Sequence, residues 1–377
     1  MEKPEVAIFI HIRDQDTMKN LITSFLIATL TIFLSLSFAG KLFAQSEVLD
    51  QYIYVCNQGS ASVAVINAAT HEIVETVDLQ EFGFSANAKP HHTVAESDGS
   101  FWYVTLIGEN RVLKFNRQNE LVDEAVLEVP GLLAMHPKED YLYVGRSMSA
   151  VNPPQSFGIV DRSDMNVLEE IDLFFTRPHA LTTTPDGDWT FVGSLSENQI
   201  LSINPAEEES NLTSLPGNNH VFVNFAVTPD GNTMIATGQI TGQLLFFDIS
   251  DPLNPELTGE LLVGSQPWHP VFSPDGEYLY FGNKQDNSIA VVNMESKMLE
   301  ETIEGEGLAQ PHGSALSKDG KYLFISNNNL NGSYNPEGID DIQNLRGTVV
   351  VINTETRSIE KVIEVGKNAT GIGTNAY

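Results

Sequence analysis

The stretch SPDGEYLYF, residues 273–281, decides the fold of this chain. Its Asp-Gly pair is typical of a tight turn between antiparallel strands, because glycine tolerates the positive φ that such turns require. The aromatic-rich run that follows, residues 278–281, is typical of a β-strand. Related turns recur along the chain, and their aspartates are Asp98, Asp186, Asp230, Asp275 and Asp319. The spacings of 88, 44, 45 and 44 residues indicate a repeat of about 44 residues, with a degenerate copy at 136–140 inside the first gap.

Each repeat contains four short strands, A to D, of which the turn joins A and B. A second apolar run such as 288–292 and a more charged third run such as 298–303 follow strand B. Repeated four-stranded antiparallel units of this length are typical of propeller blades. We therefore predict an all-β, seven-bladed β-propeller. Strand A is expected to start near Pro90, Pro130, Pro178, Phe222, Pro267, Pro311 and Asn368.

The two ends of the repeat region complement each other. The region opens with strands B to D of one blade, residues 52–79, and ends with a lone strand A, residues 369–377. We predict that the C-terminal strand A joins the N-terminal strands B–D. This pairing closes the ring and leaves no open sheet edge.

Residues 1–44 are expected to be an export signal. Residues 21–38 carry no charge, follow the polar Met18-Lys19-Asn20, and precede small residues up to Ala44. We predict a signal peptide over 1–44, with Met18 as the true start, and a propeller over 45–377. An uncleaved membrane anchor is the alternative. The mature protein is then expected in the periplasm, or outside the cell at its surface, without a membrane span.

Composition narrows the choice of partners. The chain has 50 acidic and 20 basic residues, giving a net charge of −30, which repels phosphate backbones and excludes nucleic acid. Cys56 is the one cysteine, so an intramolecular disulfide or a multi-thiolate metal site is excluded. We expect a monomer.

The segment 52–67, YIYVCNQGSASVAVIN, resembles the opening of a YVTN repeat, and 103–105 and 324–327 are weaker copies. This resemblance covers the mature chain and implies an exported propeller related to surface-layer-type and ligand-binding proteins, without fixing a function. Lactonase propellers are similar in fold. The chain lacks their D-P-x-G turn, and export fits poorly with a cytosolic sugar-phosphate lactonase.

Histidines stand at the start of strand A in four blades: His91, His92, His179, His269 and His312. Because A strands surround the centre of a propeller, these residues are expected to converge at one mouth of the channel. One interpretation is a site for copper or another transition metal, which imidazoles bind well. The layout loosely resembles the propeller of nitrous-oxide reductase, but three blades lack the histidine.

The other interpretation, which we favour, is that the imidazoles hydrogen-bond to neighbouring blades and fill the mouth. Side chains alternate along a strand, so His91 and His92 are not expected to face one target.

Three further residues are candidates for a small-ligand site at the same mouth: Arg146, His220 and Trp268. Arg146 ends a B strand and can bind an anion or form an ion pair. His71 and His136 lie in turns and are expected at the surface. Two long B–C loops, residues 147–156 and 327–347, are expected on the face of the mouth, where long loops commonly carry function.

These features predict an exported binding or scaffold protein that uses the channel mouth and the long loops for a small-molecule ligand or protein partner. The sequence contains no complete catalytic constellation, which favours a non-enzymatic role. The alternatives are a copper-type oxidoreductase centred on the histidines and a lactonase-like hydrolase.

Overall fold

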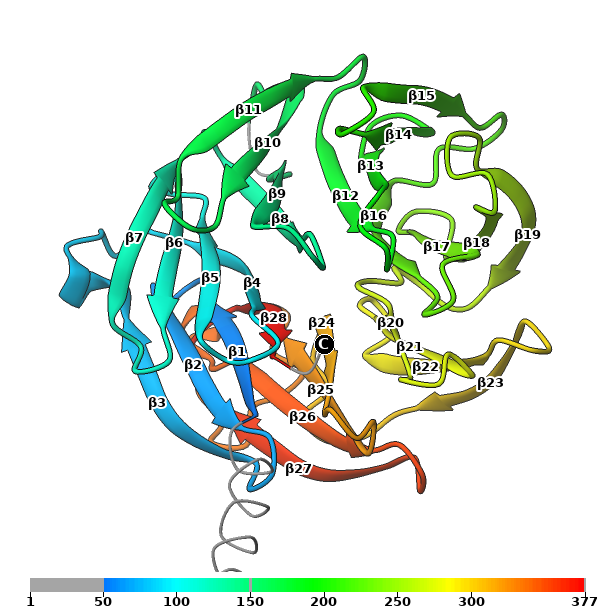
Figure 1. Ribbon diagram of the computed structural model, residues 1–377. Coiled ribbons are helices and arrows are strands. Elements are labelled where there is room, and N and C mark those ends of the chain that lie inside the picture. The colour runs from blue at the N-terminus through cyan, green and yellow to red at the C-terminus, as the bar shows by residue number, and fades with distance from the viewer. Residues whose placement is uncertain (1–50, 149–150, 376–377) are drawn as a thin grey trace, which may run out of the picture. The chain divides into compact units, whose positions relative to one another are not determined.

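The computed structural model describes residues 51–148 and 151–375, and the predicted signal peptide, 1–44, lies outside them. Seven four-stranded antiparallel sheets stand around a common axis, each forming one blade (Figure 1). The predicted all-β, seven-bladed propeller is confirmed.

The blades are as follows, innermost strand first. Blade 1 contains β28 (Ala369–Thr374), β1 (Tyr52–Asn57), β2 (Ser62–Asn67) and β3 (Glu72–Asp78). Blade 2 contains β4 (Pro90–Ala95), β5 (Phe101–Leu106), β6 (Arg111–Asn116) and β7 (Leu121–Val126). Blade 3 contains β8 (Pro130–Met135), β9 (Tyr141–Arg146), β10 (Ser156–Asp161) and β11 (Val167–Asp172). Blade 4 contains β12 (Pro178–Thr183), β13 (Thr190–Ser194), β14 (Gln199–Asn204) and β15 (Glu209–Ser214).

Blade 5 contains β16 (Phe222–Val227), β17 (Thr233–Gly238), β18 (Gln243–Asp248) and β19 (Glu256–Leu262). Blade 6 contains β20 (Val271–Phe272), β21 (Tyr278–Asn283), β22 (Ser288–Asn293) and β23 (Met298–Ile303). Blade 7 contains β24 (Pro311–Leu316), β25 (Tyr322–Asn327), β26 (Thr348–Asn353) and β27 (Ser358–Glu364). Two 3-10 helices, η1 (Leu79–Phe82) and η2 (Ile342–Asn344), lie in connections.

The ring closes as predicted, because β28 pairs antiparallel with β1. Its register places Thr374 opposite Ile53 and Ala369 opposite Asn57. The backbone N–H of Tyr52 also donates to Asn375 Oδ1 at 3.0 Å. Both ends of the described unit are therefore held within one sheet.

The Asp-Gly turns at Asp186, Asp230, Asp275 and Asp319 share one hydrogen-bond pattern, seen at residues 273–277, whereas the turn at Asp98 has Glu96 in place of the Ser or Thr. Ser273 Oγ donates to Asp275 Oδ1 at 2.5 Å, and the backbone N–H of Glu277 donates to the same oxygen at 3.0 Å. Gly276 has φ 74°, a conformation that suits glycine. Bonds to the carboxylate lower the pKa of Asp275. The Ser273 hydroxyl, the Asp275 carboxylate and the left-handed Gly276 thus each contribute to the turn, which explains why these residues recur.

The degenerate turn of blade 3 uses a histidine in place of the aspartate. His136 Nδ1 accepts the backbone N–H groups of Lys138 and Glu139, at 3.1 and 2.8 Å. His136 is buried, as is His71, whose ring lies 4.4 Å from that of Tyr322 in the neighbouring blade. Their expected place at the surface is wrong, because both turns pack against the adjoining blade.

Apolar side chains fill the space between adjacent blades. Between blades 1 and 2, the ring of Trp102 is stacked between Tyr54 and Phe115, with centroid distances of 4.9 and 4.3 Å. All three residues are buried. Each blade therefore depends on both neighbours for its core, as is usual in repeat architectures.

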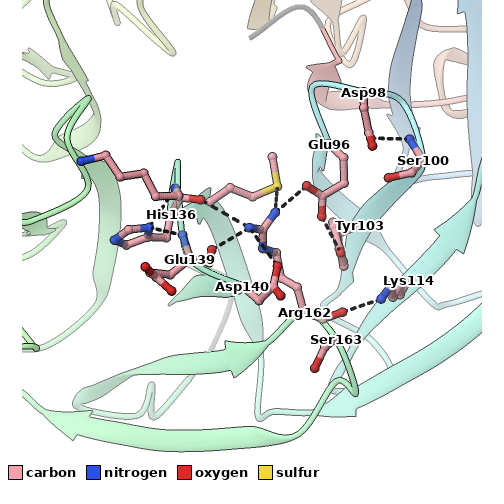
Figure 2. Close-up of polar contacts among 12 residues, drawn as sticks. Glu96, Asp98, Ser100, Tyr103, Lys114, His136, Glu139, Asp140, Arg162 and Ser163 are labelled. Carbon is pink, nitrogen blue, oxygen red and sulfur yellow. Dashed lines mark hydrogen bonds and ion pairs between the residues drawn. The ribbon is translucent and has the colours of Figure 1, made fainter.

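A polar clamp joins blades 2 and 3 at the A–B turns, centred on the buried Arg162 (Figure 2). Arg162 Nη1 donates to Glu96 Oε2 at 2.6 Å, and Nη2 donates to the Glu139 carbonyl oxygen at 2.6 Å. Tyr103 Oη donates to Glu96 Oε1 at 2.9 Å, and Lys114 Nζ donates to the Arg162 carbonyl oxygen. This guanidinium thus satisfies groups from two blades.

The substitution Arg162→Met is expected to lower the free energy of unfolding by about 3 kcal/mol, because it leaves a partly buried carboxylate without its partner. Urea unfolding followed by circular dichroism measures the loss. Arg357→Met is the matched control, since that guanidinium pairs with the more exposed Glu300 and Glu301 and its removal should cost less than about 1 kcal/mol. Equal losses in both variants would contradict the proposed role of the clamp.

A chain ending at Lys367 lacks β28, so it is expected to lose cooperative thermal unfolding. The reason is that truncation exposes the inner edge of β1 and removes one wall of the central core. Deletion of residues 335–340 from a long loop is the control and should leave the melting temperature nearly unchanged. Calorimetry that records the same transition for the truncated and full-length chains would rule out this closure model.

Candidate functional site

The same backbone conformation and the same backbone hydrogen bond occur ahead of all seven A strands. The residue before each A strand, or before Pro267 in blade 6, has a left-handed conformation, which is uncommon outside glycine. Its carbonyl oxygen accepts the N–H of the residue that follows strand B in the same blade, as in the 2.8 Å bond from Lys284 to Gln266. The D–A connection is thereby tied to the B–C turn. The seven residues are Lys89, Val129, Arg177, Val221, Gln266, Gln310 and Asn368.

A β-bulge follows this left-handed residue in most A strands. In β4, Pro90 pairs with Leu106 and Thr93 with Val104, so His91 and His92 together oppose one residue. A bulge redirects side chains that regular alternation would send to opposite faces. The bulge allows both side chains to lie among the other axial histidines, His91 beside His179 and His312 and His92 beside His269.

Five histidines meet at the centre of the ring: His91, His92, His179, His269 and His312, here called the axial cluster. The ring centroid of His91 lies 6.0 Å from that of His179 and 6.0 Å from that of His312. His269 lies 5.1 Å from His312 and 5.8 Å from His92. Residues up to 221 positions apart in the sequence thus form one group of side chains.

Trp268 belongs to the same group. Its ring lies 4.3 Å from that of His312 and 5.7 Å from that of His269. It is buried, and Pro270, which has no N–H to donate, follows closely and delays the start of β20 to Val271. The irregular segment 267–270 therefore directs both Trp268 and His269 to the cluster.

Hydrogen bonds fix the tautomers of three cluster histidines. His179 Nδ1 lies 2.8 Å from the Val223 carbonyl oxygen, which only accepts, so His179 Nδ1 carries the proton and Nε2 has a free lone pair. The backbone N–H of Leu133 donates to His92 Nδ1 at 3.2 Å, so the proton of neutral His92 is on Nε2.

His91 has the same tautomer as His92. The Gln58 amide nitrogen lies 3.4 Å from His91 Nδ1, and Gln58 Oε1 accepts from Asn368 Nδ2 at 3.0 Å. This second bond orients the Gln58 amide so that its nitrogen donates to His91. The Nε2 atom of His91 is therefore an N–H donor.

Several polar atoms of this group are buried without a hydrogen-bond partner among the described residues. They are His91 Nε2, His179 Nε2, His269 Nε2, His312 Nδ1 and Trp268 Nε1. An unsatisfied buried polar atom costs about 1–3 kcal/mol, so native proteins rarely retain several in one place without a reason.

Burial keeps the cluster neutral. It lowers the pKa of His179 to about 4 and the pKa values of His91, His269 and His312 well below the usual 6.5. Charges on neighbouring histidines and Lys284 act in the same direction on the last three. At pH 7 these rings are therefore uncharged.

Lys284 lies beside the cluster, immediately after β21. Its ammonium stands 4.1 Å above the Trp268 ring, and burial lowers its pKa to about 8. Lys284 therefore remains mainly protonated at pH 7. The sequence analysis missed Lys284, because nothing in its position after strand B indicates that its side chain folds back toward the centre.

Arg146 and His220 are not part of the axial cluster. The fully buried Arg146 donates to the Glu128 carbonyl at 2.8 Å and forms an ion pair with Glu170 at 2.5 Å. His220 packs on Phe222 and bonds through Nδ1 to Thr241 Oγ1 at 2.9 Å. The partners of Arg146 fit the ion-pair alternative, because they direct its side chain along the blade toward β11.

With this geometry known, comparison with other proteins becomes informative. Residues 123–342, more than half of the 377 residues, match the profile described as "Lactonase, 7-bladed beta-propeller". The chain belongs to this lactonase propeller family. No curated protein sequence matches it.

Solved structures share the fold of this lactonase-family propeller at low sequence identity. A functionally unknown protein from Desulfotomaculum acetoxidans has a TM-score of 0.69 and 17% identity, over 85% of this chain and 98% of its own. Hydrazine synthase from Kuenenia stuttgartiensis has a TM-score of 0.55 and 18% identity, over 74% of this chain and 96% of its own. Dihydro-heme d1 dehydrogenase NirN, in complex with DHE, has a TM-score of 0.58 and 13% identity, over 86% of this chain and 75% of its own. These likenesses establish the fold alone.

Two kinds of feature are absent from the described residues of this family member. No helix within 51–148 or 151–375 is long and apolar enough to cross a membrane. In the same part of the chain, no three His, Cys, Asp or Glu side chains are arranged to hold a metal ion.

The stability of this lactonase-family propeller is expected to fall as the pH drops from about 6.5 toward 4. Unfolded histidines take up protons near pH 6.5, whereas folded His179 does so only near pH 4, so acid favours the unfolded state. Between pH 7 and 5 this residue alone should account for roughly 2 kcal/mol.

Urea unfolding of the wild type and His179→Gln at pH 7 and pH 5 measures this difference. The variant should lose less stability on acidification than the wild type. Carboxylates do not affect this comparison, because the wild type and the variant contain the same ones. An identical pH dependence in both proteins would show that His179 is not held neutral by burial.

Proposed function

We propose that this protein is an exported binding propeller whose ligand site is the axial cluster together with Trp268. The observation that carries the proposal is the set of buried, unpartnered ring nitrogens from four blades. A small polar ligand among these rings would satisfy the atoms and recover the free energy that their burial costs. Export rests on the predicted signal peptide, and the long B–C loops are a further surface for a partner.

The site fits a small ligand better than a large one. Neighbouring rings of the cluster have centroids 5.1–6.0 Å apart, and His91, His179, His269 and His312 are buried. A ligand of a few atoms can lie between such rings, whereas a polymer cannot. Protein partners would instead contact the loops 151–156 and 327–347.

A transition metal such as copper is the alternative ligand, and only part of the cluster fits it. His179 suits a metal, because ligating histidines commonly donate their second N–H to a backbone carbonyl, as His179 does to Val223. His92 does not, because the Leu133 N–H occupies Nδ1 and leaves a proton on Nε2. A metal would therefore rely on His179, His269 and His312, and the oxidoreductase role depends on that smaller set.

Lactone hydrolysis is a second candidate function, favoured by membership of the lactonase propeller family. The Nε2 lone pair of His179 could act as a general base toward water, and the His91 Nε2–H could stabilise the developing oxyanion. The burial of both rings counts against this role, since a lactone would have to enter the cluster. Release of acid from γ-butyrolactone, compared between the wild type and His179→Gln, tests it directly.

The binding proposal predicts that a small ligand raises the melting temperature through the cluster. Thermal unfolding is measured with 10 mM sodium formate, 10 mM sodium nitrate, 1 mM γ-butyrolactone and equimolar Cu²⁺ or Zn²⁺. A ligand at about 100 times its Kd should stabilise the wild type on the order of 5 °C. The shift should disappear in His312→Asn, because this substitution shortens a cluster side chain.

His71→Asn is the matched control, since His71 is also buried with an unpartnered Nε2 but packs against Tyr322, away from the cluster. This variant should respond to ligand like the wild type. A wild type that responds to none of the five probes, or a His312→Asn variant that responds fully, would overturn the binding function.

A further inference from the structure

We infer that the ligand of the axial cluster is a small oxyanion, held between imidazole N–H groups and the ammonium of Lys284. This inference rests on the proposed binding function and names the chemical class of its ligand. It also adds Lys284, a residue outside the cluster, as the counter-charge.

The first argument is that the hydrogen bonds leave donors in the site. The backbone N–H of Leu133 and the amide of Gln58 occupy the Nδ1 atoms of His92 and His91, so each ring carries its proton on Nε2. The Trp268 Nε1–H, a group that can only donate, is buried without an acceptor. A ligand that satisfies these groups must supply acceptor oxygens.

The second argument is the sign of the local charge. The ionisable groups that act on His91, His269 and His312 are other histidines and Lys284, and no carboxylate is among them. Lys284 is the one group in this set that is mainly charged at pH 7. A metal cation would be repelled by the ammonium, whereas an anion would be attracted.

The third argument is the isolation of Lys284 from acidic groups. The chain has 50 acidic residues for 20 basic ones, and other bases such as Arg111, Arg162 and Lys361 pair with carboxylates. Lys284 instead lies over the Trp268 ring, and no described carboxylate pairs with it. Its charge is thus available to an incoming anion beside the donors.

The net charge of −30 acts against anion binding, and distance decides which effect is larger. At physiological ionic strength, exposed charges farther than about 8 Å are largely screened, so Lys284 and the nearby N–H groups dominate. A single ammonium matches a monovalent anion. The close spacing of the rings restricts the ligand to a few atoms, as in a carboxylate or nitrate.

Isothermal titration calorimetry tests the inference in chloride-free buffer at pH 7, with sodium formate and sodium nitrate as separate titrants. We expect the wild type to bind at least one of them with a stoichiometry of one. Lys284→Met keeps the length of the side chain and removes the charge, so the affinity should fall at least tenfold. The two titrants distinguish a carboxylate from an inorganic oxyanion.

Lys297→Met is the matched control, because the Lys297 ammonium also lies over an aromatic ring, that of Phe246 at 5.3 Å, away from the cluster. Its affinity should stay within twofold of the wild type. Circular dichroism and the melting temperature verify that each variant is folded.

The outcomes separate this inference from the binding function. Anion binding that Lys284→Met leaves unchanged would overturn the role of Lys284. If the cluster binds Cu²⁺ or Zn²⁺ but neither anion, the binding function stands and the oxyanion is wrong. If the wild type binds neither anions, metals nor lactone, both proposals fail.

Discussion

The candidate site depends on β28, because this closing strand lies between the two strands that bring His91 and His312 together. Thr370 of β28 donates through Oγ1 to the Pro90 carbonyl at 3.4 Å, and Ser326 of β25 donates to the Thr370 carbonyl. Blades 2 and 7 are thereby held on either side of blade 1. The 6.0 Å separation of the His91 and His312 rings follows from this arrangement. The strand that closes the ring therefore also holds His91 and His312 at this distance.

Buried polar groups are treated differently in two parts of the molecule. In the clamp between blades 2 and 3, the two terminal nitrogens of Arg162 bond to Glu96 and Glu139, and the repeated turns satisfy their own carboxylates. At the axis, several ring nitrogens have no partner among the described residues. Native proteins tolerate such unsatisfied groups mainly where function requires them. Isolated atoms without a partner also occur elsewhere, as at Arg162 Nε and His71 Nε2, so the gathering of five such atoms in one place is the main physical reason to place the function at the axis.

Family membership and function are separate conclusions for this protein. The lactonase propeller profile accounts for residues 123–342, and solved propellers with 13–18% identity share the architecture. One fold commonly supports unrelated activities, so the chemistry must be inferred from the site itself. The tautomers of His91, His92 and His179 are the most specific evidence available, because they determine which atoms can donate and which can accept. Those of His91 and His92 favour a ligand that offers acceptor oxygens, whereas His179 Nε2 is itself an acceptor.

The sequence by itself determined the propeller, the number of blades, the closing strand and the alignment of histidines at the starts of the A strands. These features could be predicted because they rest on local chemistry, such as the Asp275-Gly276 turn, repeated at a constant period. The tertiary structure alone decided that His91 and His92 both lie beside other axial histidines, since a bulge in β4 has no clear local signature. It also decided that Arg146 turns toward Glu170 and that Lys284 reaches Trp268. Such pairings depend on where the ring places side chains from separate strands. Those distances cannot be predicted from the linear pattern of residues.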